Sequence, residues 1–221
     1  MVQEKFNGDQ KNLNYILASF DKNIIHSLLP LIPSYISTTH LTVMTLLWSV
    51  LIVACGYLSG LDMHWLWAFN ICIFFQHVTD MLDGAVGRMR KEGLVKWGFY
   101  MDHFLDYIFL CAVIIGYSFL LPDSFVILVL LCITFCGGIM VHFFLDFAIT
   151  NEFKISFNQF GSSEIRYVLI IFNIVVILVG KHILVYLFPV IVLALGIVLM
   201  IIIYKSQKIF RNMDREESKR K

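Results

Sequence analysis

The chain has 221 residues, of which 59% are hydrophobic and only 15% are charged, and its mean hydropathy is +0.79. This composition excludes an ordinary soluble domain and predicts a protein that crosses a membrane several times. The formal net charge of +1 is uninformative about binding partners.

An amphipathic segment comes first along the chain. Its apolar residues recur at helical spacing from Leu13 to Leu28, and polar residues, Asp21 among them, occupy the other positions. The segment is too polar to span a bilayer, so we expect a helix that lies in the cytoplasmic interface of the membrane. Pro30 ends this helix, and the hydroxyl of Ser37 can cap the start of the next one.

Six later segments are long and apolar enough to cross a membrane, because a transmembrane helix needs about 20 mostly apolar residues. They are residues 40–60, 64–84, 97–121, 124–148, 165–181 and 182–204. The predicted fold is therefore an all-α integral membrane protein with six transmembrane helices preceded by the interfacial amphipathic helix. Its predicted divisions are an arm at residues 1–36, the six-span domain at residues 37–204 and a basic cytoplasmic tail at residues 205–221.

Lysine and arginine are distributed unevenly around the predicted spans. All but one of the 17 fall in the arm, in or beside the loops after the second and fourth spans, or in the tail; the exception is Lys181. Because positive charge stays on the cytoplasmic side, we expect a multi-pass protein with both termini in the cytoplasm. The tail fits this topology and contact with anionic lipids, and no nucleic-acid partner is expected. The compact chain without extra domains points to a prokaryotic inner membrane.

A polar run lies between the second and third predicted spans. It reads D-x-x-D-G-x-x-G-R, then nine residues, then G-x-x-x-D-x-x-x-D, and its carboxylates are Asp80, Asp83, Asp102 and Asp106. Spacings of three and four place each pair on one helix face, and antiparallel packing would bring all four to one depth. A carboxylate in or near a bilayer is costly and marks a functional site with a cationic partner. The simplest partner for this group is a divalent metal ion.

The residues around these carboxylates suit a diphosphate ligand. Magnesium takes few carboxylates from a protein and completes its shell with water and substrate phosphate. Gly84 and Gly87 allow close backbone approach, and Gly98 lets a neighbouring helix or a ligand come near. Arg88 can offset phosphate charge. The sequence therefore predicts a diphosphate held by metal beside this run.

The run resembles the signature of the CDP-alcohol phosphotransferase family, D-x-x-D-G-x-x-A-R, about eight residues, then G-x-x-x-D-x-x-x-D. Seven fixed positions match, and Thr39-His40-Leu41-Thr42 is similar to the N-x-L-T that often opens the family's first span. Two departures, Gly87 in place of the usual alanine and the nine-residue spacer, indicate a divergent member. The family comprises membrane enzymes that move a phospho-alcohol group from a CDP-linked donor to an acceptor hydroxyl and release CMP.

The resemblance implies a role for each residue of the run. Asp80, Asp83 and Asp102 would bind one or two divalent ions, usually Mg²⁺, with Mn²⁺ as the substitute. Asp106 would share this metal site and act as general base on the acceptor hydroxyl. The CDP pocket would be lined by Gly84, Gly87, Arg88 and Gly98. Lipid or small-alcohol acceptors, a role in phospholipid biosynthesis and a homodimeric assembly are further implications.

A second residue competes for the role of the base. His103 directly follows Asp102, which resembles the choline and ethanolamine phosphotransferase branch of the family. A neutral imidazole titrates near physiological pH and is a capable base. However, His103 lies about 100° around the helix from Asp102, so we favour Asp106.

Three other charged or polar residues have two interpretations each. Glu164 and Arg166, at the start of the fifth predicted span, either bind a polar headgroup of donor or acceptor or belong to an ordinary helix start. His77 lies three residues before Asp80 on roughly the same face. It either supports a carboxylate or makes an interhelical hydrogen bond.

Two alternatives remain for the function itself. Within the enzyme class, CDP-diacylglycerol with a polar acceptor competes with a CDP-aminoalcohol donor and diacylglycerol, and the Asp102-His103 pair leans toward the second. A divalent-cation transporter or channel would also use intramembrane carboxylates. Transport requires polar groups near the midplane, where Asn70 and Asn173 are the main candidates, and the loops on the far side are short and nearly uncharged. We therefore prefer the enzyme.

Overall fold

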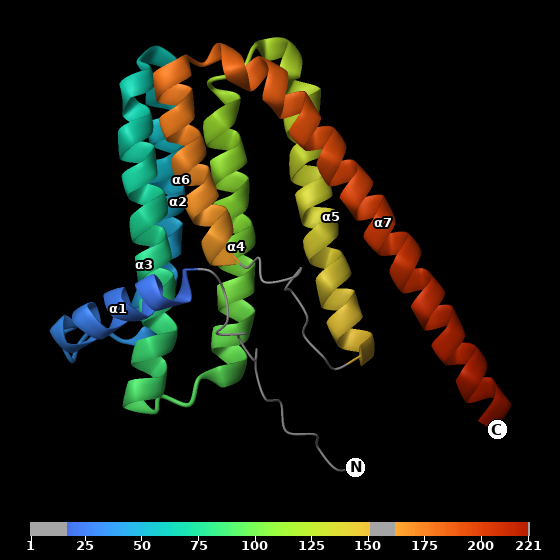
Figure 1. Ribbon diagram of the computed structural model, residues 1–221. Coiled ribbons are helices and arrows are strands. Elements are labelled where there is room, and N and C mark those ends of the chain that lie inside the picture. The colour runs from blue at the N-terminus through green and yellow to red at the C-terminus, as the bar shows by residue number, and fades with distance from the viewer. Residues whose placement is uncertain (1–16, 151–161, 221) are drawn as a thin grey trace.

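The computed structural model describes residues 17–150 and 162–220, and every regular element in these two ranges is a helix (Figure 1). The α-helices are α1 (Ala18–Leu28), α2 (Thr38–Leu61), α3 (Leu66–Arg90), α4 (Val95–Ser118), α5 (Val126–Thr150), α6 (Ser162–Val179) and α7 (His182–Arg220). Short 3₁₀ turns precede α2, α3 and α5: η1 (Leu29–Leu31), η2 (Met63–Trp65) and η3 (Asp123–Phe125). The predicted all-α class is confirmed.

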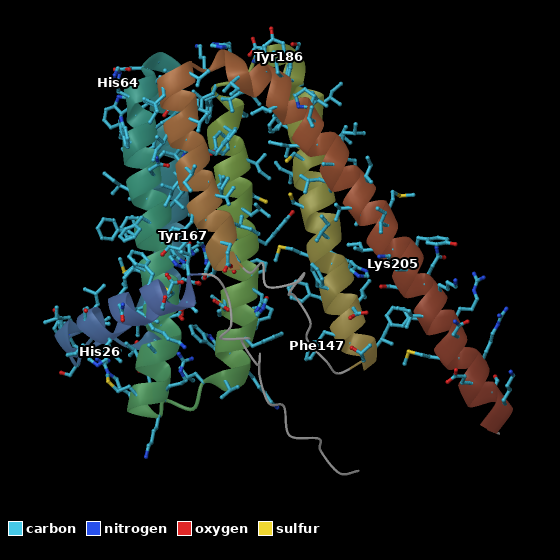
Figure 2. The ribbon with its side chains drawn as sticks, in the orientation of Figure 1. His26, His64, Phe147, Tyr167, Tyr186 and Lys205 are labelled. Atoms are coloured by element: carbon cyan, nitrogen blue, oxygen red, sulfur yellow. The ribbon has the colours of Figure 1, made fainter. Side chains whose placement is uncertain are left out.

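The helices α2, α3, α4 and α6 pack into one bundle, and α5 pairs with α7 beside α4 (Figure 1). The main core of buried apolar side chains, which includes Ile52, Phe69 and Val176, holds these helices together. Toward the end where α1 lies across the bundle, α5 and α7 diverge from α4. Figure 2 shows His64 and Tyr186 at the opposite end.

Four of the described helices are long and apolar enough to cross a membrane: α2, α4, α5 with its preceding turn, and α7. Four such helices, in a chain of this composition, indicate a membrane protein. The helix α3 is not among them, and its buried face carries polar side chains such as Gln76, His77 and Asp80. The number of six spans stays a prediction.

The turn between α6 and α7 forms at Gly180, whose φ of +108° lies in the region that favours glycine. This turn falls at the predicted division between residues 181 and 182. The helix α7 then continues as one element through residues 204 and 205 and into the basic segment. The predicted tail is therefore helical over its described part.

The helix α1 turns the side that carries Ile24 and Leu28 toward α3, and Asp21 is buried on the same side. It ends at Leu28 before Pro30, as expected, and the predicted positions before residue 17 lie outside the described residues. Phe20 is 49% exposed, which agrees with an apolar side chain that faces lipid, whereas Asp21, which the pattern assigns to the polar face, is 0% exposed. The position of α1 in the membrane interface stays a prediction. The prediction for Asp21 is wrong because α3 and α6 supply polar partners for its carboxylate.

Glycines allow α2 and α4 to pack in backbone contact. A Cβ atom on Gly56 of α2 would lie only 2.4 Å from the Cα of Gly116 of α4. Small residues at such crossings permit close helix packing in membranes. We expect Gly56→Leu to lower stability by about 3 kcal/mol or more, at the upper end of overpacking costs because the obstructing atoms are backbone.

The measurement for Gly56→Leu is the temperature at which half of the purified protein in detergent loses its monodisperse elution peak. Ala54→Leu adds the same side chain at an exposed position of α2 and is the matched control. Equal midpoints for the two variants would contradict the importance of this crossing.

Candidate active site

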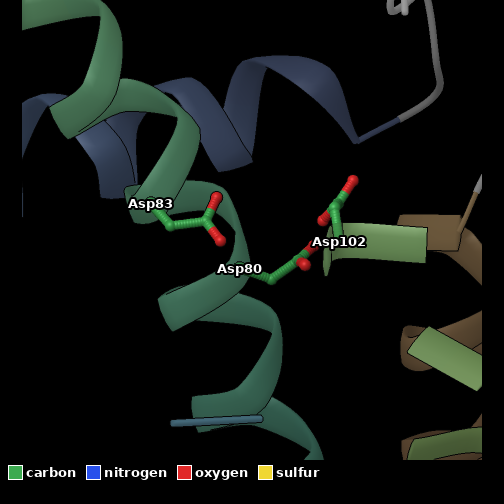
Figure 3. Close-up of side chains that lie close together, drawn as sticks. All are labelled: Asp80, Asp83 and Asp102. Atoms are coloured by element: carbon green, nitrogen blue, oxygen red, sulfur yellow. The ribbon is translucent and has the colours of Figure 1, made fainter. Parts of the chain in front are cut away.

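Three carboxylates of the polar run converge between α3 and α4. Asp80 and Asp83 of α3 and Asp102 of α4, hereafter the aspartate trio, each offer one oxygen, and these oxygens lie within 4.8 Å of one another (Figure 3). Asp80 and Asp83 are buried and Asp102 is partly exposed, so the trio meets solvent at Asp102. Oxygen ligands this close together fit a hard divalent cation such as Mg²⁺. The residues present therefore fit the metal that the sequence predicts.

Two threonines of α2 orient Asp83 within the trio. Thr42 Oγ1 donates a hydrogen bond of 2.7 Å to Asp83 Oδ2, and Thr38 Oγ1 donates one of 3.0 Å to the Asp83 carbonyl. Hydrogen bonds from outside a ligand set fix the orientation of metal-binding carboxylates. In the sequence, Thr42 is notable only as the last residue of the stretch that resembles the family's N-x-L-T. Its hydrogen bond to Asp83 gives a physical reason for a hydroxyl at this position.

Arg166 of α6 bridges two of the predicted carboxylates. Its Nη1 donates to Asp80 Oδ2 at 3.2 Å, and its Nη2 donates to Asp106 Oδ1 at 2.7 Å. Arg166 is only 5% exposed, so its charge and that of Asp80 are removed from water together. These contacts place Arg166 beside two of the predicted carboxylates, and its binding of a headgroup stays a prediction. Glu164 lies buried in the first turn of α6.

Asp106 lies apart from the aspartate trio. It is one turn further along α4 than Asp102, it is partly exposed, and it forms an ion pair with Arg166. Of the four carboxylates that the sequence predicts as metal ligands, the structure brings three together, and the fourth, Asp106, is joined to Asp80 of the trio through Arg166.

His103 turns toward α5. Its Nδ1 lies 2.7 Å from the Phe99 carbonyl oxygen, so this nitrogen carries a hydrogen and donates it. The centroid of the buried His103 ring is 4.4 Å from that of Phe99 and 5.9 Å from that of Phe144 of α5. Nδ1 is 3.9 Å from Asp102 Oδ2. The imidazole therefore sits beside the trio, with its ring packed among aromatic side chains.

The glycines of the run have different surroundings. A Cβ atom at Gly98 would meet nothing within 4 Å, and one at Gly84 would lie 3.2 Å from Nη1 of the exposed Arg88. Gly98 therefore leaves open space, whereas the space at Gly84 is taken by the Arg88 side chain. A Cβ atom at Gly87 would lie 2.9 Å from Thr38 Oγ1, so Gly87 makes room for α2. This contact favours glycine over the usual alanine at this position.

Arg90, which in the sequence counts only as one of the charges that predict topology, organises the segment that leads into α2. Its guanidinium donates to the backbone carbonyl of Ile36 and, at 3.0 to 3.4 Å, to those of Ile32, Pro33 and Ser34. These bonds tie the end of α3 to the start of α2, where Thr38 and Thr42 lie. The acceptors lie 54 to 58 positions earlier in the chain, so no local pattern could have revealed them.

A second polar cluster, which the sequence did not reveal, lies next to the site. Asp21 Oδ1 of α1 accepts a hydrogen bond of 2.7 Å from the Tyr167 hydroxyl of α6 and lies 3.2 Å from His77 Nε2 of α3. For His77, the interpretation as an interhelical hydrogen bond is confirmed. Periodicity could not identify Asp21, because its partners lie 56 and 146 positions away.

Comparison with known proteins gives one match. The model of the CDP-alcohol phosphatidyltransferase family matches residues 31–202, a range that contains the trio, Asp106 and Arg166. No curated protein and no solved structure matches the chain. Since the matched range covers most of the sequence, this chain belongs to the CDP-alcohol phosphatidyltransferase family.

Proposed function

We propose that this chain is an integral membrane enzyme that transfers a phospho-alcohol group from a CDP-linked donor to an acceptor hydroxyl and releases CMP. The observation that carries the proposal is the convergence of the aspartate trio within the range that the family matches. In phosphoryl transfer, catalysis consists mostly of positioning and of stabilising charge. The family's place in phospholipid synthesis indicates the class of product.

The donor half of the site would be formed by the trio and the end of α3. The trio would hold one or two Mg²⁺ or Mn²⁺ ions, which supply charge stabilisation for the diphosphate and for the departing CMP. Thr42 keeps Asp83 oriented. Arg88 is exposed and has no ion pair within residues 17–150 and 162–220, so it is available to bind phosphate. Gly98 leaves space for the ligand, Gly84 lets the Arg88 side chain lie against α3, and Gly87 makes room for Thr38.

The acceptor half would lie around Asp106. Asp106 would take the proton of the acceptor hydroxyl, and Arg166 holds its carboxylate in place. His103 is the alternative base: with the hydrogen on Nδ1 donated to Phe99, the ring's lone pair is on Nε2. Arg166 and Glu164 would contact a polar headgroup of the donor or the acceptor.

Two substrate pairs fit this arrangement. CDP-diacylglycerol with a phosphorylated polar acceptor needs a second cation besides Arg88, and Arg166 supplies one inside the site. A CDP-aminoalcohol with diacylglycerol agrees with the resemblance of the Asp102-His103 pair. In either case we propose a six-span homodimer with both termini in the cytoplasm. We place it in a prokaryotic inner membrane.

Divalent-cation transport has less support. The two midplane candidates bond to each other, with Asn173 Nδ2 donating to Asn70 Oδ1 at 2.7 Å. The Tyr117 hydroxyl donates to Asn173 Oδ1 at 2.6 Å, and both asparagines are buried. These amides join α3, α4 and α6, which is a packing role and leaves no reason to assign them to an ion path.

The test of the proposed function is CMP release by the purified protein in detergent with Mg²⁺. The donors are CDP-diacylglycerol, CDP-choline, CDP-ethanolamine and CDP-glycerol, each offered with a lipid extract and with a panel of polar alcohols. We expect CMP release from one donor, and its loss when Mg²⁺ is removed by a chelator. Failure of every donor, together with no binding of CDP to the same sample, would exclude the proposed function.

A further inference from the structure

We propose that Asp21 of α1 is a positioning residue of the active site, which ties α3 to α6 and thereby fixes Arg166 across Asp80 and Asp106. This inference rests on the proposed function for its kinetic consequence. Its structural content, the coupling of three helices through one buried carboxylate, is independent of which reaction the site performs.

The buried Asp21 carboxylate joins three helices that are distant in sequence. Its Oδ1 is bonded to the Tyr167 hydroxyl of α6 at 2.7 Å and lies 3.2 Å from His77 Nε2 of α3. Asp21 is 0% exposed and His77 is 1% exposed. Figure 2 places Tyr167 where α6 meets α1. A carboxylate fully removed from water requires such partners, and it holds them in a defined geometry.

Both partners of Asp21 are close in sequence to residues of the site. Tyr167 directly follows Arg166 in the first turns of α6, and His77 precedes Asp80 by three residues on α3. The hydrogen bond from Tyr167 to Asp21 fixes the rotation of α6 about its axis. The contact of His77 with Asp21 holds α3 against the same carboxylate. Arg166 bonds to Asp80 Oδ2 and Asp106 Oδ1 from the same helix, α6, whose position the contact of Tyr167 with Asp21 determines.

Attachment of α1 to the bundle does not depend on Asp21 alone. Ile24 and Leu28 of α1 pack against a small apolar cluster that includes Val78 and Leu82 of α3. The Tyr167 ring also packs edge-on against Phe20 and His77, with centroid distances of 6.2 and 5.1 Å. These apolar contacts hold the helix in place, so the hydrogen bonds of Asp21 contribute orientation more than attachment.

The closing experiment compares Tyr167→Phe and Asp21→Asn with the wild type. Tyr167→Phe removes only the hydroxyl and keeps the ring contacts, and Tyr186→Phe, at an exposed tyrosine of α7, is the matched control. By analogy with residues that orient metal ligands, we expect kcat for CMP release to fall roughly 10-fold or more in Tyr167→Phe and in Asp21→Asn. The affinity for CDP, which lacks the headgroup that Arg166 would contact, should stay within about twofold of the wild type, since the side chains of the trio and Arg88 are unchanged.

A second readout does not require turnover. Amide hydrogen exchange of the first turns of α6 should be faster in Tyr167→Phe than in Tyr186→Phe, while exchange in α2 should be unchanged. If the wild type releases no CMP from any donor, the proposed function fails and the exchange result alone decides the positioning role. Wild-type kcat in both Tyr167→Phe and Asp21→Asn, or unchanged exchange in α6, would overturn it. A parallel loss of kcat, CDP affinity and thermal stability would overturn it too, because it indicates a structural role only.

Discussion

Replacing Asp83 by asparagine is expected to reduce CMP release about a thousandfold or more, because metal ions supply several kcal/mol of charge stabilisation in such reactions and each 1.36 kcal/mol is a factor of ten. Asp83 belongs to the aspartate trio, whose oxygens lie within 4.8 Å of one another. An amide binds divalent cations far more weakly than a carboxylate does. The fold should survive, since the asparagine oxygen can still accept the hydrogen bond that Thr42 donates at 2.7 Å.

The measurement for Asp83→Asn is kcat as a function of Mg²⁺ concentration, with thermal stability in detergent recorded on the same sample. Asp123→Asn is the matched control, because Asp123 is an exposed carboxylate in the turn before α5, at the other end of the bundle. Normal turnover in Asp83→Asn would refute the metal assignment. Loss of turnover in both variants would show that removing a negative charge, wherever it lies, is the cause.

Replacing Asp106 by asparagine is expected to lower kcat by about 10²- to 10⁴-fold, the usual contribution of a general base. Asparagine keeps an oxygen for Arg166, which donates to Asp106 Oδ1 at 2.7 Å, but it cannot take a proton from the acceptor hydroxyl. Donor binding should persist, since Asp106 lies outside the trio. The measurement is single-turnover CMP release at saturating donor and Mg²⁺.

The comparison variant for Asp106→Asn is His103→Gln. His103 packs between Phe99 and Phe144 and bonds to the Phe99 carbonyl, a contact that glutamine can keep in part. We expect His103→Gln to retain turnover within about tenfold of the wild type, as for a residue outside the proton transfer. The reverse order of effects would make His103 the base. Recovery of Asp106→Asn at high Mg²⁺ would assign Asp106 to the metal site instead.

Helical spacing was sufficient to predict that carboxylates of α3 and α4 meet, although it grouped all four and did not single out the trio. Residues three or four apart share a helix face, and a short connection between two helices makes them antiparallel neighbours. In the structure only residues 91–94 separate α3 from α4. The helix α3 continues to Arg90, beyond the predicted end of its span at residue 84, so the first half of the motif is entirely helical. Most of the nine-residue spacer is also helical, so the connection between the two halves of the motif is short.

Contacts between residues far apart in the chain could not be predicted in the same way. Spacing left Arg166 with two interpretations, because its pairing with Asp80 and Asp106 depends on how α6 packs against α3 and α4. The contact of Gly87 with Thr38 likewise requires the approach of α2. Each involves a partner that periodicity along one helix does not specify.

The sequence by itself determined the all-α membrane class, the family resemblance and the chemistry of the carboxylates, because composition and helical period are local properties. The tertiary structure decided which carboxylates form the trio, which two pair with Arg166, and that Asp21 is buried between α3 and α6. The physical reason is desolvation. Whether a charged side chain is buried depends on the partners that packing brings to it, and those partners come from other helices.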